Sequence, residues 1–383
     1  MNKFLYYQQN DKTVVNFVPF SKDVTPKKST YFSIFRNIFV VSCCIVGALF
    51  TYTMTFSSPV ETLSLEITDQ RIKYSGLDAN SILQLFEEFK VTYNKTYTSV
   101  DEENLRYIYF RNFLKVIDER NGNDTLAVHG ITKFADLSND EFKKVSLGYK
   151  PLTSVTNAKS IYLDAYDGNK TYINWANIYT TAVKDQGYCG SCWAFSATEQ
   201  IESDAIRLGL LTTSDTLSPE QIVQCDTMDD GCDGGNTETA FEYVKMAGGI
   251  ESEDAYPYTS YYDVTGSCTS NSADFLVTVD EYYSLADEDA MITHMFSTGP
   301  ISICLDASSW SSYVSGIITT CGMDVDHCVQ AVGINMDDGY WIVRNSWGTE
   351  WGNEGYIWLE VGSNMCNIAY DPKYLQVSSV STR

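Results

Sequence analysis

The sequence predicts an α+β fold with a helical lobe and a lobe of strands, preceded by a small helical domain and a transmembrane helix. Helix-compatible segments occupy residues 81–121 and 192–225, whereas short strand-like runs dominate from about residue 275 onward. A polar linker separates the first helical segment from the rest, and an uncharged apolar run precedes both. These three observations place two layers of different secondary structure after a separate N-terminal part.

Length and charge narrow the class of protein. The 383 residues suffice for two or three compact units. Residues 166–383 hold 7 Lys or Arg against 32 Asp or Glu, a net charge of −25, whereas residues 1–165 have a net charge of +1. This acidic half argues against a nucleic-acid partner. It suits work in an acidic compartment, and an ordinary solvated acidic face is the alternative.

The uncharged run from Asn37 to Val60 predicts a membrane span. About 20 apolar residues cross a bilayer as a helix, and this run is too long and too far from the terminus for a simple signal peptide. Arg36 precedes it and Glu61 follows it. The positive-inside rule therefore predicts a type II anchor, with a cytoplasmic tail at 1–36 and a transmembrane segment at 37–58. A buried core helix is the alternative.

The cysteines indicate a lumenal protein. Of 11 cysteines, Cys43 and Cys44 lie in the apolar run and the other nine follow residue 188. That density is unusual in the cytosol and indicates a compartment that permits disulfides. Asn94, Asn123 and Asn169 lie in Asn-x-Thr sequons, so glycosylation is an expectation there.

Residues 184–195, Lys-Asp-Gln-Gly-Tyr-Cys-Gly-Ser-Cys-Trp-Ala-Phe, carry the candidate nucleophile. An apolar, helix-compatible run follows Cys192, which places its thiol at a helix start. Free N–H groups and the helix dipole there favour the thiolate. Gln186 offers a side-chain amide toward the same place. Alone, Cys-x-x-Cys would also fit a metal knuckle or a redox pair.

A thiolate needs a base and a group that orients the base. Three histidines are present: His129 in the N-terminal helical part, His294 in an apolar helical context, and His327 just before a strand-like run. Elimination favours His327. Asn345 opens the sequence Asn-Ser-Trp-Gly eighteen residues later, and Trp347 lies within it.

These motifs resemble those of the papain and cathepsin cysteine peptidases. The N-terminal helices agree: one helical stripe resembles the Glu-Arg-Phe-Asn-Ile-Asn pattern of cathepsin L-type propeptides, with Phe113 in place of the first Asn. Its members are Glu102, Arg106, Phe110, Ile117 and Asn121. The run Gly130–Asp136 resembles a second propeptide motif, with Thr132 in an Asn position.

The resemblance implies a papain-like two-domain fold with a cleft between the lobes. It implies an inhibitory propeptide at 81–150 that lays its following segment through the cleft, a linker or activation segment at 151–171, and a peptidase domain at 172–383. With the anchor, this organisation is similar to the membrane-anchored zymogens of protozoan parasites, such as falcipains.

The resemblance also implies the chemistry. Cys192 and His327 would form a thiolate–imidazolium pair, Asn345 would accept the ring N–H, and Trp347 would shield that bond. The Cys192 N–H and the Gln186 side chain would hold the oxyanion. No metal or other cofactor is implied.

Three disulfides follow from the resemblance: Cys189–Cys232, Cys225–Cys268 and Cys321–Cys366. It places further residues along the substrate groove, with Cys304, Cys328 and Asp371 at one pocket. We expect Cys304 and Cys328 to be simple packing residues; a fourth bridge is the alternative. The groove set is Gly234, Gly235, Asn236, Thr237, Cys304, Asp326, Cys328, Trp347 and Asp371. A polar pocket that accepts Arg or Lys as well as aliphatic side chains is the expectation.

We therefore expect a cysteine endopeptidase, made as a membrane-anchored zymogen and acting in an acidic lysosomal or vacuolar lumen or after secretion. Its partners would be protein and peptide substrates, its own prodomain and a membrane, with no nucleic acid. A catalytically dead scaffold, a thiol–disulfide oxidoreductase using Cys189 and Cys192, and an exopeptidase are the alternatives.

Overall fold

The computed structural model describes residues 71–152, 159–161, 166 and 168–380, together with two short N-terminal strands. These strands, β1 (Tyr6–Gln9) and β2 (Lys12–Val15), pair antiparallel with each other in a unit separate from residues 66–383. The expected membrane segment at 37–58 lies outside the described residues. Among the helices that are described, none has the length and apolarity needed to cross a bilayer.

Residues 71–150, called the prodomain below, begin with two packed helices, α1 (Ala79–Thr92) and α2 (Val100–Asn123). The side chains of Asp78 and Ser99 cap their first turns. Phe110 and Ile117, two members of the predicted stripe, are fully buried against α1 residues such as Phe86. The hydrophobic seam between the helices therefore explains the periodic pattern.

The polar members of the stripe hold the rest of the prodomain. Arg106 donates to Glu141 at 2.9 Å, and Asn121 bonds both backbone groups of His129. They tie α2 to the short strand β3 (Ala127–His129) and to α3 (Asn139–Ser146), which opens with a Ser138–Glu141 capping box.

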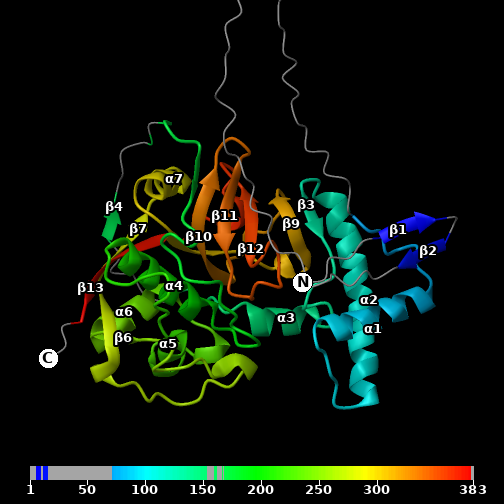
Figure 1. Cartoon of the computed structure of the whole chain (residues 1–383), viewed down its shortest axis with the longest axis horizontal. Helices are drawn as coiled ribbons and strands as arrows, with labels where there is room; N and C mark the ends of the chain where they lie inside the picture. Colours follow the sequence, from blue (N-terminus) through cyan, green and yellow to red (C-terminus); the bar gives the residue numbers. More distant parts are fainter. Residues whose placement is uncertain are drawn as a thin grey trace, which may run out of the picture. The chain divides into compact units, whose positions relative to one another are not determined.

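Three helices form the core of the helical lobe, and the apolar faces of these helices pack on one another around fully buried Trp193. They gather at the lower left of Figure 1. The helices are α4 (Cys192–Arg207), α5 (Pro219–Cys225) and α6 (Thr237–Ala247). Short 3₁₀ turns connect the elements of both lobes: η1 (Gly231–Asp233), η2 (Ser260–Tyr262), η3 (Ser272–Asp274), η4 (Trp310–Ser312) and η5 (Met365–Asn367).

The strand lobe is a mostly antiparallel sheet in the order β3-β9-β12-β11-β10-β8-β13-β7-β4, with β5 pairing β10 and β6 pairing β7. Its strands are β4 (Lys159–Ile161), β5 (Tyr172–Asn174), β6 (Ile250–Glu251), β7 (Phe275–Leu285), β8 (Ile301–Leu305), β9 (Tyr313–Ile318), β10 (His327–Asn335), β11 (Tyr340–Arg344), β12 (Tyr356–Glu360) and β13 (Lys373–Ser379). Helix α7 (Glu288–Ser297) packs beside it, with His294 buried in its core-facing side.

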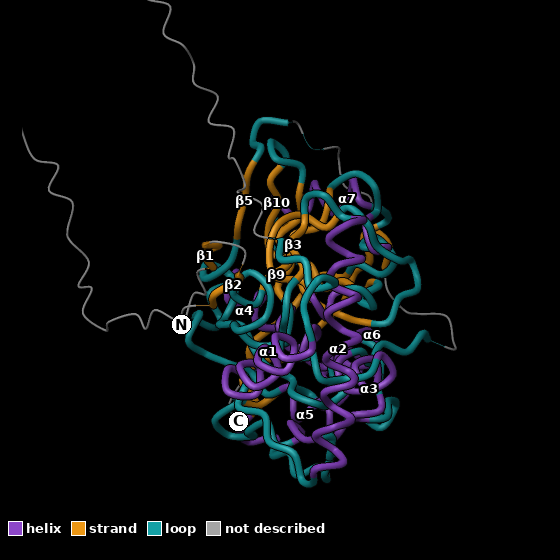
Figure 2. Tube along the Cα trace, turned by 90° about the vertical axis from the view of Figure 1, so that its right-hand side faces the viewer, coloured by secondary structure: helices purple, strands orange, loops and turns teal. Residues whose placement is uncertain are grey.

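The prodomain joins this sheet directly. Strand β3 pairs antiparallel with β9, so the prodomain adds a strand to one edge of the sheet, and the view of Figure 2 shows the two strands together. Prodomain residues Phe134 and Phe142 pack edge-on against Trp347, with ring centroids 5.1 and 5.5 Å away.

The seam between the two lobes is polar and buried. Ser196 donates to the carbonyl of Val329 at 2.7 Å, and Gln330 donates to the carbonyl of Glu199 at 3.1 Å. Arg344 pairs with Glu199 at 3.4 Å, with both side chains at most 1% exposed. Burial raises the pKa of Glu199 to about 7, although Arg344 acts against this shift. Helix α4 is thus bonded to β10 and β11 along its length.

Candidate active site

Cys192 is the first residue of α4, after Ser191. Its side chain is fully buried, and it is the free cysteine of the described part of the chain. The backbone N–H of Gly148, in the prodomain, donates to its sulfur at 3.2 Å. The helix start predicted for this thiol is therefore present, and a prodomain backbone covers it.

His327 begins β10 and lies in a buried aromatic setting. Its Nε2 hydrogen-bonds to Asn345 Oδ1 at 2.8 Å, and the Trp347 ring lies 4.9 Å from its ring. Its Nδ1 has no hydrogen-bond partner among the described residues. The backbone N–H of the next residue, Cys328, interacts with the Cys192 sulfur, so the start of β10 and the start of α4 meet at the thiol.

Burial keeps the thiol and the imidazole neutral in this state. It raises the pKa of Cys192 to about 12 and lowers the pKa of His327 to about 4. The Gly148 and Cys328 N–H groups donate to the sulfur, and Asn345 Oδ1 accepts from the His327 ring; these hydrogen bonds oppose the two pKa shifts without reversing them. The expected thiolate–imidazolium pair is thus disfavoured while the prodomain covers the site.

Gln186 is fully buried, and both polar atoms of its side chain are hydrogen-bonded. The Nε2 atom of Gln186 donates to the carbonyl of prodomain residue Ser146 at 3.2 Å and to the Cys189 carbonyl at 2.9 Å. Its Oε1 accepts from the Ser346 hydroxyl at 2.6 Å, which fixes the amide orientation. The amide expected to hold an oxyanion is therefore held by a prodomain carbonyl.

Residues 146–150, called the strap, bond to both lobes at the position expected for the substrate groove. Tyr149 and Gly235 form a parallel bridge, in which Gly235 N–H donates to the Gly148 carbonyl and Lys150 N–H donates to the Gly235 carbonyl, both at 2.8 Å. Tyr149 N–H donates to the Asp326 carbonyl at 3.1 Å. The strap thus satisfies its backbone as an added strand would.

Two glycines permit this close approach. A Cβ on Gly148 would lie 1.8 Å from the Gly190 carbonyl oxygen, and one on Gly234 would lie 2.7 Å from the Gly148 carbonyl oxygen. Gly234 also has a φ of 108°, which disfavours residues with side chains. At the sulfur, the strap presents the N–H group of Gly148 as a hydrogen-bond donor.

The Tyr149 side chain lies against residues that the resemblance assigns to a substrate pocket. This ring packs on the cluster that contains Cys304 and Cys328, and it meets Tyr370 edge-on with centroids 6.1 Å apart. Asn236 donates to the Lys150 carbonyl at 3.0 Å, and the Thr237 hydroxyl lies 3.9 Å from the Cys304 sulfur.

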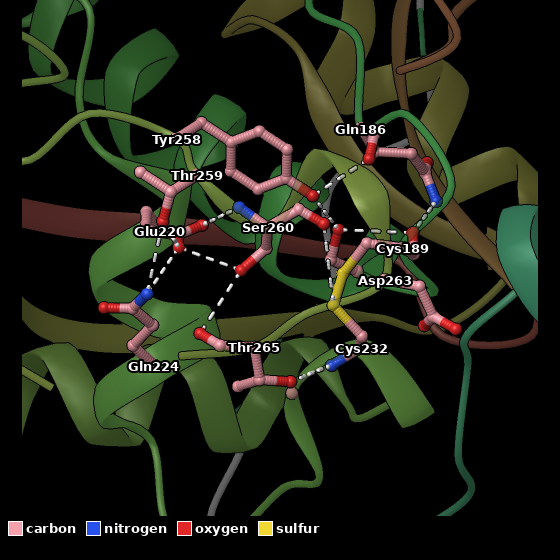
Figure 3. Close-up of a disulfide and its surroundings, with 12 residues drawn as sticks. Gln186, Cys189, Glu220, Gln224, Cys232, Tyr258, Thr259, Ser260, Asp263 and Thr265 are labelled. Atoms are coloured by element: carbon pink, nitrogen blue, oxygen red, sulfur yellow. Dashed lines mark hydrogen bonds between the residues drawn. A yellow bond between two sulfur atoms is a disulfide. The ribbon is translucent and has the colours of Figure 1, made fainter. Parts of the chain in front are cut away.

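Four disulfides are formed. Three are the pairs implied by the resemblance, Cys189–Cys232, Cys225–Cys268 and Cys321–Cys366. The fourth joins Cys304 to Cys328, so the expectation that these two are unbonded packing residues is wrong. They lie directly opposite each other on β8 and β10, which explains the pairing. Because Cys189 bonds Cys232 and Cys192 is free, a Cys189–Cys192 redox pair is also excluded (Figure 3).

Asp371, expected at the pocket floor, forms an ion pair with Lys373, which also pairs with Glu238 at 2.8 Å. Lys373 is almost completely buried. The sequence did not predict this buried cation, which offsets part of the negative charge expected there. The role of Ser346 in orienting Gln186 was not predicted either. The described residues contain no cluster of three or more His, Cys, Asp or Glu that could hold a metal.

Comparisons with known proteins agree with this geometry. The family model described as "Papain family cysteine protease" matches residues 170–376, and the model described as "Cathepsin propeptide inhibitor domain (I29)" matches residues 86–142. Cysteine proteinase 2 of Leishmania pifanoi is 38% identical over 302 residues, covering 75% of this chain and 68% of the relative.

A viral cathepsin of Choristoneura fumiferana nuclear polyhedrosis virus is 37% identical, covering 78% of this chain and 93% of the relative. Among solved structures, the digestive procathepsin L2 proteinase of Tenebrio molitor matches with a TM-score of 0.69 at 30% identity, over 77% of this chain and 99% of that one.

Proposed function

This chain belongs to the papain family of cysteine proteases and carries a cathepsin propeptide inhibitor domain, and from that premise we propose that it is an endopeptidase using a Cys192–His327–Asn345 triad. The observation that carries the proposal is the meeting of the starts of α4 and β10 at one free thiol, with Asn345 on the far side of the imidazole. Such an arrangement provides a nucleophile, a base and a group that orients the base.

The proposed reaction begins when the strap leaves and water enters the groove. Loss of burial removes the main cause that holds Cys192 and His327 neutral, so the thiol proton passes to the free Nδ1 of His327. The helix start of α4 then stabilises the thiolate.

The thiolate attacks the scissile carbonyl carbon. Gln186 Nε2, freed from the Ser146 carbonyl, stabilises the oxyanion together with the Cys192 backbone N–H. Losing one such donor typically costs about 2.7–4 kcal/mol of transition-state stabilisation. His327 protonates the leaving amine and then removes a proton from the water that hydrolyses the thioester.

The groove residues have proposed roles in holding substrate. Gly235 and the Asp326 carbonyl pair with the strap backbone, so we assign them to the substrate backbone in the released enzyme. Gly234 leaves room for that backbone, and Trp347 shields the His327–Asn345 bond. We assign Asn236, Thr237, Cys304, Cys328 and Asp371 to a substrate pocket. Tyr149 supports this assignment, because it packs on the cluster that contains Cys304 and Cys328 and interacts with Asn236 and Asp371.

We extend the proposal to location. The uncharged run at 37–58, with basic residues before it and acidic residues after it, supports a type II membrane anchor. The four disulfides and the acidic composition of residues 166–383 support a lysosomal, vacuolar or secreted lumenal enzyme.

Acid incubation of the purified lumenal part tests the proposal. We expect processing near residues 151–171, a new N-terminus identified by sequencing, and hydrolysis of peptides that are blocked at both ends. Cys192→Ala should abolish both hydrolysis and thiol-inhibitor labelling. Ser191→Ala, which removes a neighbouring hydroxyl but keeps the thiol, should retain labelling. Peptide hydrolysis by the Cys192→Ala chain would disprove the assigned nucleophile.

A further inference from the structure

We propose that the rim of the groove is a binding surface for basic polypeptides, formed by Asp185, Asp230 and Asp263 and called the acidic rim. The surface selects substrates with Lys or Arg on both sides of the cleaved bond. This inference rests on the proposed peptidase function and names a substrate class for the same groove.

Three lysines of the prodomain form ion pairs with the acidic rim. Lys133 pairs with Asp185 at 3.1 Å, Lys144 pairs with Asp263 at 2.8 Å, and Lys150 pairs with Asp230 at 2.6 Å. In every pair the cation belongs to the prodomain and the carboxylate belongs to the enzyme. The structure therefore shows each carboxylate of this surface paired with a lysine of another polypeptide segment.

Two of the three carboxylates meet the prodomain chain on either side of the residue that covers the thiol, and the third is the sequence neighbour of Gln186. Lys144 lies just before the strap and Lys150 ends it, while the Gly148 N–H contacts Cys192 between them. Asp263 and Asp230 thus meet the chain on opposite sides of the thiol. Asp185 directly precedes Gln186, and in the view of Figure 3 Asp263 lies on the same side of the Cys189–Cys232 bridge as Gln186.

The enzyme half has little positive charge to replace the departing lysines. Residues 166–383 contain 7 Lys or Arg, and five of these already pair with acids of the same half. Those five are Lys184, Arg207, Lys245, Arg344 and Lys373. Removal of the prodomain therefore leaves the acidic rim facing the groove, where a net charge of −25 also draws cationic chains by long-range attraction.

The test uses mature enzyme obtained from the full chain and three peptides that share one central sequence. The residues about three positions from the cut on each side are Lys in the first peptide, Gln in the second and Glu in the third. We expect kcat/KM for the Lys peptide to exceed that for the Glu peptide by about tenfold at low salt. The ratio should shrink toward one as salt rises to about 0.5 M.

The variant Asp185→Asn/Asp230→Asn/Asp263→Asn should reduce the Lys-to-Glu ratio to below about twofold. A matched control, Asp274→Asn/Asp280→Asn/Asp289→Asn, removes three exposed carboxylates from η3, β7 and α7 and should keep the ratio. Because the two variants change the net charge equally, comparing them distinguishes a local effect of the acidic rim from a general effect of the net charge.

Each other outcome overturns the inference. Equal cleavage of the three peptides would show that the rim serves only to hold the prodomain, while the peptidase function stands. An equal fall for all three peptides in the rim variant would indicate a structural role. Equal loss of the ratio in rim and control variants would assign the preference to net charge. Failure to cleave any peptide would instead contradict the proposed function.

Discussion

The prodomain meets the enzyme at two places of different chemical character. The strap binds through backbone groups, with Gly148 over the thiol and Tyr149 in the pocket. The edge contact, defined here as β3 and Asp124 against β9 and the residues beside it, buries charged and titratable side chains. Asp124 accepts from the backbone and hydroxyl of Thr319, both at 2.9 Å, and His129 bonds the Ser312 hydroxyl at 2.9 Å.

The strap therefore blocks access to the thiol, whereas the edge contact holds the prodomain on the sheet. The strap blocks the thiol with groups that do not titrate near neutral pH, so its fit depends on shape. The edge contact depends on the protonation state of buried groups, so its strength depends on pH. A change in the strap should therefore alter access to the thiol without altering how that access depends on pH. A change in the edge contact should alter the pH dependence of that access.

The largest effect is expected from Gly148→Ala. The added Cβ meets the Gly190 carbonyl, a backbone group that cannot turn away, so the strap must lift from the groove. We expect a cost of about 4 kcal/mol and a roughly 1,000-fold faster alkylation of Cys192 in the zymogen. The measurement is the rate of thiol labelling at neutral pH.

Gly76→Ala is the matched control, because no atom lies within 4 Å of the Cβ position there. Its labelling rate should equal that of the wild type. If Gly148→Ala also labels at the wild-type rate, the strap does not depend on shape and the contrast with the edge contact fails.

The second largest effect is the loss of prodomain docking at low pH, through protonation of His129. Burial lowers the pKa of His129 from 6.5 to about 4, and the nearby cations Arg120 and Arg71 lower it further against the opposing effect of Asp124. The docked state therefore excludes the proton. Its stability is complete above pH 6.5 and falls as the pH drops toward 4, by up to about 3 kcal/mol.

The test compares Cys192 labelling in the wild type with that in His129→Asn across this pH range. Taking the ratio of the two rates cancels the titration of the thiol itself. We expect the wild type to open increasingly faster than the variant as the pH falls, by roughly 100-fold at most. A ratio that does not change with pH would remove His129 from the acid response.

The smallest effect is expected at Asp226 in the helical lobe, the residue that follows α5. Burial raises its pKa to about 8, with a further contribution from Asp229, which accepts from the Asn236 N–H. The folded state thus holds a proton that the unfolded chain releases at pH 3.8 and above, so stability decreases as the pH rises from 3.8 to about 8.

Asp226→Asn should raise the free energy of unfolding near neutral pH by about 1–2 kcal/mol and leave it nearly unchanged in acid. Thermal melting of the zymogen at both pH values provides the measurement. Asp280→Asn, an exposed carboxylate on β7, is the control. An equal shift at both pH values would mean that Asp226 affects packing rather than proton binding.

The sequence predicted those features that depend on local chemistry. Cys192 lies at a helix start because an apolar helical run follows it, and the apolar runs at 301–305 and 340–343 form strands. The papain-like α+β fold and the propeptide agree with the solved procathepsin structure. The pairing of Cys304 with Cys328 could not be derived, because it depends on which residues face each other once β8 and β10 pair.

Long-range contacts explain the other omissions. Strand β13 contains the charged residue Lys373, which reads as a surface residue until Glu238 and Asp371 surround it. Strand β9 contains Gly316 at a φ of 82°, which weakens its strand pattern, and it gains its partner from the prodomain. The protonation of Cys192 and His327 was also beyond the sequence, because burial by the strap determines it.

The bonded seam between the lobes limits how the groove can move. Opening it would break the Arg344–Glu199 pair and the Gln330 bonds among buried residues, where unpaired polar groups are costly. The two lobes therefore form a rigid unit and do not rotate relative to each other about a hinge. A ligand must fit the space that the departing strap leaves, and selection among ligands depends on side chains at the rim and pocket rather than on closure around the ligand.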